Sequence, residues 1–206
     1  MVRLLGTFAA DSPEWYEARW DHVGGSEIAK ICGWSKYGTR ADLMADKLRR
    51  EPRRTKSMQR GHYVESAVLA YLCDTLNVTV DPEASAATYC ADDDDRFSYN
   101  PDGITTDWGL LEAKSTSDRS IDEGWGRART DLVPIGYQAQ TQWGMGILGI
   151  PEGWLGVLAG AHNGRPDLHF AAYRIRFNPK AFSYMKSRAA RFLEDLAAAR
   201  KGQHED

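Results

Sequence analysis

The stretch SYNPDGITTDWGLLEAKS, residues 98–115, decides how the rest of the chain is interpreted. Asn-Pro-Asp-Gly is a turn sequence, and short segments bounded by turn residues predict antiparallel strands over 96–100 and 109–115. Asp102, Glu112 and Lys114 all fall within this short stretch. The pattern therefore predicts a β-meander that carries two carboxylates and a lysine.

Strand geometry groups these three side chains. Successive side chains of a strand alternate between its faces, so Glu112 and Lys114 project from the same side. If the preceding strand ends at Asp102, its carboxylate lies beside Glu112. Two adjacent carboxylates repel each other unless a cation separates them, and hard oxygen ligands suit Mg²⁺. A metal at this position could assist phosphodiester hydrolysis, with the Lys114 ammonium orienting the water and stabilising developing charge.

The motif alone leaves two interpretations open. One is the metal-dependent catalytic set, Asp102, Glu112 and Lys114. The other is a turn whose aspartate bonds its own backbone, followed by an exposed Glu–Lys pair on a strand. The neighbouring Asp107 is interpreted as an ordinary turn carboxylate.

The segments on both sides predict an α/β fold. Capping residues and apolar periodicity predict helices over 13–20, 24–33, 40–50 and 57–77, then 135–149 and a last helix that begins at Pro179. Strands are predicted over 84–90, 153–161 and 168–177, the last two joined by the turn 162–167. This order predicts one domain over 1–206, with a helical layer at about 12–77 and a mixed central β-sheet flanked by helices at about 84–200.

Composition limits the classes of protein to which this chain can belong. The formal net charge is −3, so any DNA contact must depend on local charge, such as the run LRREPRRTK over 48–56, which is alternatively a solvated helix end. The chain has three widely spaced cysteines, which favours neither a disulfide framework nor a zinc site. No apolar run is long enough to span a bilayer, which predicts an intracellular protein without membrane contact.

Four ordered segments resemble one family. NPDG followed by LLEAKS is similar to the PD-(D/E)xK nuclease motif. With WYEARWDHVGGSEIAKICG, MQRGHYVESAVLAYL and YQAQTQWGM, the chain resembles YqaJ-type viral recombinases, the lambda exonuclease-like family. The resemblance spans residues 15–145 and implies a PD-(D/E)xK, restriction-endonuclease-like core. It favours the catalytic interpretation of the motif.

The resemblance also implies roles for individual residues. Asp102 and Glu112 would hold Mg²⁺, which Mn²⁺ could replace, with the Ala113 carbonyl as a further ligand and Lys114 as the catalytic lysine. Glu65 matches an additional acidic residue that reaches a second metal or the water, and Gln140 matches a glutamine at the edge of the active site. Arg19 and Ser26 match residues that bind a terminal 5′-phosphate. For each of these residues an ordinary structural role stays open as the alternative: an exposed helix charge for Glu65, a core-edge amide for Gln140, a surface arginine for Arg19 and a helix cap for Ser26.

The function implied by the resemblance is a Mg²⁺-dependent 5′→3′ exonuclease. Such an enzyme degrades one strand of linear duplex DNA to 5′-mononucleotides and leaves 3′ overhangs for recombination. Its expected partners are double-stranded DNA ends, a single-strand annealing protein and other copies of the chain in a trimeric ring, in the cytoplasm of a phage-infected or prophage-carrying bacterium. Alternatives are an endonuclease or repair nuclease of the same fold, and a catalytically silent DNA-binding module.

Overall fold

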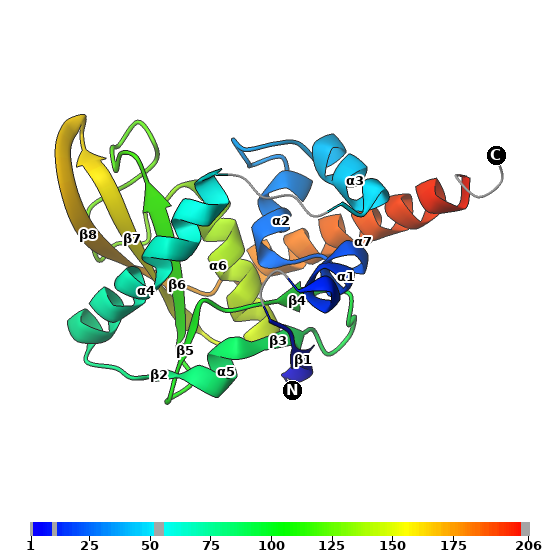
Figure 1. Ribbon diagram of the computed structural model, residues 1–206, viewed down its shortest axis with the longest axis horizontal. Coiled ribbons are helices and arrows are strands. Elements are labelled where there is room, and N and C mark those ends of the chain that lie inside the picture. Colours follow the sequence, from blue (N-terminus) through cyan, green and yellow to red (C-terminus); the bar gives the residue numbers. More distant parts are fainter. Residues whose placement is uncertain (1, 10–11, 52–55, 203–206) are drawn as a thin grey trace.

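A computed structural model describes residues 2–9, 12–51 and 56–202. It has a mixed α/β architecture with two sheets and seven helices over these residues, as expected from the sequence (Figure 1). Residues 52–55 of the basic run lie outside the described residues. Among those described, no helix combines the length and the apolar character needed to cross a membrane.

The larger sheet has five strands in the order β2-β5-β6-β7-β8, and only its β6–β7 pair is parallel. A smaller antiparallel sheet has the order β1-β3-β4. The strand bounds are β1 (Arg3–Thr7), β2 (Val80–Asp81), β3 (Ala87–Cys90), β4 (Ser98–Tyr99), β5 (Gly103–Thr105), β6 (Leu110–Thr116), β7 (Glu152–His162) and β8 (Arg165–Arg176).

Helices cover both faces of the larger sheet. They are α1 (Pro13–Asp21), α2 (Gly25–Ile31), α3 (Arg40–Arg49), α4 (Lys56–Leu76), α5 (Pro82–Ala86), α6 (Ile135–Leu148) and α7 (Pro179–Gly202). Helix α4 lies across β6 and β7 on one face, whereas α6 packs between the sheet and α2 and α7 on the other (Figure 1). The buried face of α7 consists of Met185, Ala189, Phe192, Leu193 and Leu196, as its apolar spacing predicts.

Alternation along β6 determines which side chains face which helix layer. Leu111 packs with Leu72 of α4 in one apolar cluster, whereas Leu110 belongs to the large core that includes α6 and α7. Glu112 lies two residues after Leu110, so its side chain faces the same side of the sheet, and it is fully buried. The β6 strand therefore presents the predicted catalytic side chains toward the α6 side of the sheet.

The pairing around the motif differs from the predicted meander. Strand β4 pairs with β3 in the smaller sheet, and the antiparallel partner of β6 is β5, a segment that the sequence assigned to a turn. The prediction of a strand over 84–90 was also wrong in its first half, because Asp81 caps the short helix α5 and Pro82 occupies its first position. The β7–β8 turn is shorter than predicted: Asn163 and Gly164 both have positive φ, as a two-residue hairpin turn requires.

Candidate active site

The centre of the candidate site is the middle of β6, where Glu112 and Lys114 flank Ala113. The Glu112 carboxylate is fully buried, and its Oε1 accepts a charge-assisted hydrogen bond from Lys114 Nζ. Both side chains therefore project to the same side of the strand, as alternation predicts. The sequence alternative of an exposed Glu–Lys pair is wrong for these two residues.

Asp102 completes the cluster from the turn between β4 and β5. Its Oδ2 accepts a hydrogen bond of 2.8 Å from the Ala113 amide and lies 3.6 Å from Lys114 Nζ. The Ala113 carbonyl oxygen is 3.1 Å from the same ammonium. Oxygen atoms of Asp102, Glu112 and Ala113 therefore converge on one cationic atom.

Electrostatics in this cluster follow from burial and like charge. Burial, and then the neighbouring Asp102 carboxylate, raise the pKa of Glu112, while the Lys114 ammonium acts in the opposite direction. Burial alone would lower the pKa of Lys114, but the two carboxylates outweigh it and raise that pKa above its ordinary value. A cation is thus favoured at this position.

Two further side chains fix the Glu112 carboxylate. Gln140 Nε2, on α6, donates to Oε1, and the Tyr99 hydroxyl, on β4, donates to Oε2. Burial, followed by the charge of Glu112, raises the pKa of Tyr99 well above its ordinary value, so the hydroxyl keeps its proton. The sequence pointed to Gln140 but missed Tyr99, although Tyr99 lies within the same stretch three residues before Asp102.

The Tyr99 ring occupies space that two glycines leave open. A β-carbon at position 25 would lie 2.9 Å from the ring, and one at position 144 would lie closer still. Gly25 opens α2 next to Ser26, and Gly144 lies on α6 four residues after Gln140. The ring therefore packs between α2 and α6 while its hydroxyl reaches Glu112.

We expect Tyr99→Phe to fold but to lower stability by about 1–3 kcal/mol, because a buried carboxylate oxygen loses its donor. Cleavage should fall because Glu112 is less firmly oriented. Chemical denaturation and a nuclease assay measure the two effects. Tyr89→Phe is the matched control, since its hydroxyl donates to the Ala84 carbonyl at 2.9 Å, away from the cluster. Equal activity losses in the two variants would contradict a specific role for Tyr99.

Glu65 lies at the edge of the cluster. It is half-buried on α4, and burial raises its pKa, with a further contribution from Asp102 and opposite ones from His62 and Lys114. Glu65 is therefore close enough to Asp102 and Lys114 for their charges to affect its carboxyl group. Within the described ranges, no three His, Cys, Asp or Glu side chains are gathered into a metal site by themselves.

The donor set nevertheless fits a hard divalent cation. Two carboxylates and a backbone carbonyl are the oxygen ligands that Mg²⁺ accepts, and water completes such sites. The three oxygens already surround a positive atom, Lys114 Nζ. The metal prediction for Asp102, Glu112 and Ala113 is consistent with this arrangement.

The two residues predicted to bind phosphate lie next to each other. Arg19 Nη2, on α1, donates to Ser26 Oγ, on α2, at 3.0 Å, and the guanidinium lies 4.4 Å from the centre of the Trp15 ring. Ser26 is exposed and Arg19 is half-buried. Their hydroxyl and guanidinium can both donate to an anion at this point.

A cavity of about 690 Å³ extends from Ser26 to Gln140. Its wall includes aromatic side chains, among them Trp34, Tyr37 and Tyr137. Ser26 contacts Arg19 and Gln140 donates to Glu112, so the cavity is lined by one neighbour of Arg19 and one neighbour of the carboxylate cluster. The sequence did not predict this cavity, since its wall comes from four separate segments.

Comparison with known proteins agrees with the fold. LHK-Exo, an alkaline exonuclease from Laribacter hongkongensis, is 20% identical with a TM-score of 0.70 over 94% of this chain and 97% of that one. Its structure in complex with dAMP gives 20% identity and a TM-score of 0.71 over the same shares. A phage-related exonuclease from Haemophilus somnus 129PT is 13% identical, with a TM-score of 0.55 over 86% of this chain and 96% of that one. These likenesses confirm the predicted PD-(D/E)xK fold.

The sequence comparisons identify the family. No curated protein matches the sequence. Residues 14–151, which contain all the site residues described above, match the model of the YqaJ-like viral recombinase domain. The chain therefore belongs to the family of YqaJ-like viral recombinase domains.

Proposed function

We propose that this chain is a Mg²⁺-dependent 5′→3′ exonuclease that removes 5′-mononucleotides from one strand of linear duplex DNA. Its family and fold make it a DNA phosphodiester hydrolase of the exonuclease class. The proposal adds the polarity, the product and the metal. The observation that carries it is the convergence of Asp102, Glu112 and Ala113 oxygens around Lys114, together with the Arg19–Ser26 contact, whose Ser26 lines the same cavity as Gln140.

The proposed chemistry assigns a task to each side chain. Asp102, Glu112 and the Ala113 carbonyl would hold Mg²⁺, with Glu65 near a second position. When bound, the metal supplies a Lewis acid that neutralises charge on the scissile phosphate. The Lys114 ammonium donates hydrogen bonds that orient the attacking water and stabilise the negative charge developing on the phosphate oxygens. Gln140 and Tyr99 keep Glu112 oriented through its two oxygens.

The Arg19–Ser26 pair supports the polarity. Arginine presents a planar fork of donors that suits phosphate oxygens, and the exposed Ser26 hydroxyl adds one more donor. A 5′-phosphate held there would leave the first nucleotide in the aromatic-walled cavity and the next phosphodiester near Lys114. Cleavage at that bond releases a 5′-mononucleotide and creates a new 5′-phosphate end. LHK-Exo has been solved with dAMP, a nucleotide of this kind.

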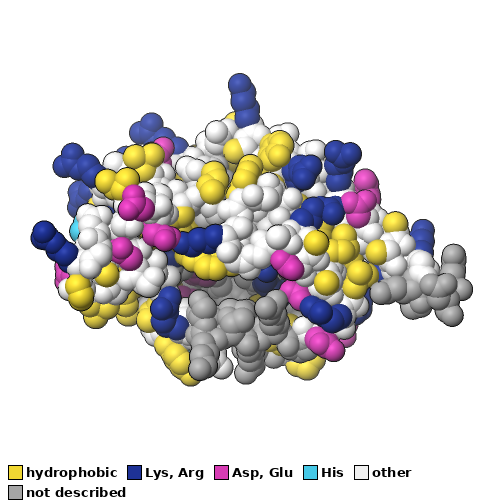
Figure 2. All heavy atoms as spheres, turned by 90° about the horizontal axis from the view of Figure 1, so that it is seen from above, with side chains coloured by type: hydrophobic (Ala, Val, Ile, Leu, Met, Phe, Trp, Pro, Cys, Tyr) yellow, Lys and Arg dark blue, Asp and Glu magenta, His cyan; other side chains and the backbone are white. Residues whose placement is uncertain are grey.

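The setting of the reaction is also part of the proposal. We propose that the chain acts as one domain over 1–206, in a trimeric ring, on DNA ends prepared for a single-strand annealing protein in the cytoplasm of a bacterial host. Lys and Arg side chains are spread over the face in Figure 2 with Asp and Glu among them. Because the net charge is −3, copies of the chain that pool their basic residues around DNA would supply the needed positive field.

The decisive assay compares linear duplexes with 5′-phosphate and 5′-hydroxyl ends, with and without Mg²⁺. We expect digestion only with Mg²⁺, faster on the phosphorylated end, with mononucleotide products. Arg19→Ala should abolish the preference for phosphorylated ends, because a charge-assisted contact to phosphate is lost. Arg191→Ala, which removes an exposed arginine of α7, is the matched control and should keep the preference.

Three results would contradict the proposal. Cleavage of closed circular duplex at the rate of linear duplex would identify an endonuclease instead. An unchanged preference in Arg19→Ala would remove Arg19 from the phosphate site. Release of mononucleotides from 3′ ends would reverse the polarity.

A further inference from the structure

Lys47, on α3, is a buried lysine that has no role in the proposed hydrolysis. Its exposed fraction is 2%, and its ammonium has three acceptors: the Arg19 carbonyl at 2.6 Å, the His22 carbonyl at 2.7 Å and Glu27 Oε1 at 3.0 Å. An ammonium has three N–H donors, so each one is matched. Burying a charge is costly unless it is paired and hydrogen-bonded, which makes this full set of contacts a specific arrangement.

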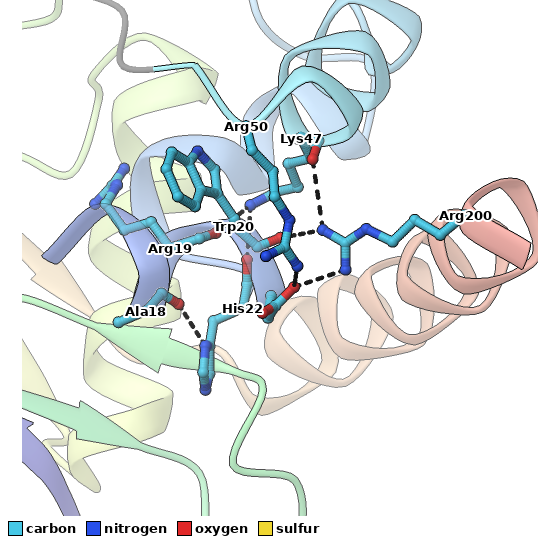
Figure 3. Close-up of polar contacts among 8 residues, drawn as sticks. Ala18, Arg19, Trp20, His22, Lys47, Arg50 and Arg200 are labelled. Carbon is cyan, nitrogen blue, oxygen red and sulfur yellow. Dashed lines mark hydrogen bonds and ion pairs between the residues drawn. The ribbon is translucent and has the colours of Figure 1, made fainter. Parts of the chain in front are cut away.

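No residue of helix α1, which carries Arg19, is fully buried. Three donors contact the carbonyls of its last turn: the ring of its own C-cap residue His22 contacts the Ala18 carbonyl, Lys47 binds the Arg19 carbonyl, and Arg200 Nη2 binds the Trp20 carbonyl at 3.1 Å. Figure 3 shows Lys47 and Arg200 reaching this turn from α3 and α7. Cationic donors are favourable at the C-terminal end of a helix. Polar contacts from α3 and α7 thus help to fix the last turn of α1.

Glu27 extends this arrangement to the second phosphate-binding residue. It follows Ser26 directly, and while its Oε1 pairs with Lys47, its Oε2 accepts a hydrogen bond of 3.0 Å from the Gly24 amide. The Lys47–Glu27 pair therefore joins the backbone of Arg19 to the start of α2. Arg19 and Ser26 come from different helices, and this pair bridges the two.

We propose that Lys47, through Glu27, is a positioning residue that holds Arg19 and Ser26 at the spacing needed to select phosphorylated 5′ ends. The inference rests on the proposed function, because it concerns the phosphate site of that reaction. Lys47 itself touches neither phosphate nor metal in this scheme. Its effect passes through the Arg19 carbonyl and through Glu27.

A purely structural role makes a different prediction. A variant that merely lowers the folded fraction loses activity on phosphorylated and hydroxyl ends in the same proportion. A variant that shifts Arg19 relative to Ser26 loses activity on the phosphorylated end selectively. The ratio of kcat/KM for the two ends therefore separates the two roles.

The experiment measures this ratio with Mg²⁺ for the full chain and four variants. In Lys47→Met, we expect the ratio to fall on the order of tenfold or more toward that of Arg19→Ala, since displacement of about 1 Å suffices for large losses. Activity on hydroxyl ends should stay near that of the unchanged protein. Glu27→Gln keeps the shape and an oxygen acceptor, so its ratio should fall by a smaller factor. Lys186→Met is the matched control: it removes the ion pair between Lys186, on α7, and Asp93, and should leave the ratio unchanged.

The outcomes distinguish the two proposals. If the unchanged protein has no preference for phosphorylated ends, the phosphate site fails and this inference fails with it. If Arg19→Ala loses the preference but Lys47→Met keeps it, only the positioning role is overturned. Should Lys47→Met not fold, by circular dichroism, Glu27→Gln decides: an undiminished ratio in that variant overturns the inference, and a reduced ratio with unchanged hydroxyl-end activity supports it.

Discussion

Lys114→Ala should lower the rate of DNA digestion by about 10²- to 10⁴-fold, the range typical of removing a group that assists proton transfer or stabilises developing charge. The Lys114 ammonium contacts Glu112 and the Ala113 carbonyl and lies 3.6 Å from Asp102 Oδ2. Nothing else described in this cluster supplies a cationic donor at that point. The measurement is single-turnover digestion of a 5′-phosphorylated duplex with saturating Mg²⁺.

A matched control keeps this result interpretable. Lys180→Ala removes an exposed lysine at the start of α7 and should digest DNA at the normal rate. Binding of duplex by Lys114→Ala, followed by fluorescence anisotropy, should remain within a few-fold of normal, because the loss is in the chemical step. Full activity in Lys114→Ala would refute its assignment as the catalytic lysine.

Asp102→Asn should reduce digestion about a thousandfold or more and raise the Mg²⁺ concentration needed, because a neutral amide is a far weaker ligand for Mg²⁺ than a carboxylate. The amide oxygen can still accept the hydrogen bond from the Ala113 amide, so the turn should keep its shape. Isothermal titration with Mg²⁺ in the absence of DNA measures the affinity directly. We expect Asp102→Asn to bind Mg²⁺ at least tenfold more weakly than the unchanged protein does.

Asp107→Asn is the control for this variant. Asp107 lies in the turn between β5 and β6, where its carboxylate accepts from the Thr105 hydroxyl, and it was interpreted from the sequence as an ordinary turn residue. The Asp107→Asn variant should digest DNA and bind Mg²⁺ as the unchanged protein does. Equal Mg²⁺ affinity in Asp102→Asn and the unchanged protein would show that Asp102 is not a ligand.

The sequence predicted the parts of the site that depend on local rules. Alternation placed Glu112 and Lys114 on one side of β6, and the Asn-Pro-Asp-Gly turn brought Asp102 beside them. The capping residues Thr39 and Ser12 marked the starts of α3 and α1. These features need only neighbouring residues, which is why one sequence sufficed. The roles assigned to the gathered residues remain predictions.

What the sequence missed depends on contacts between distant segments. Strand β1 pairs with β3 across most of the N-terminal half of the chain, and no local pattern fixes such a partner. Tyr99 is indistinguishable in sequence from a core aromatic residue, because its role depends on a hydroxyl reaching Glu112. Lys47 looks like a solvated helix lysine, although it lies four residues after the buried Leu43 and so on the same helix face.

Helix α1 contributes Arg19, yet none of its residues is fully buried in the core. Most substitutions on such a helix leave the hydrophobic core intact, so they carry a small folding penalty. The residues around Arg19 can therefore vary in evolution, or in a mutagenesis library, more freely than those on β6 or α6. Changes in the kind of DNA end that is accepted can thus arise on α1 while the hydrolytic centre stays as it is.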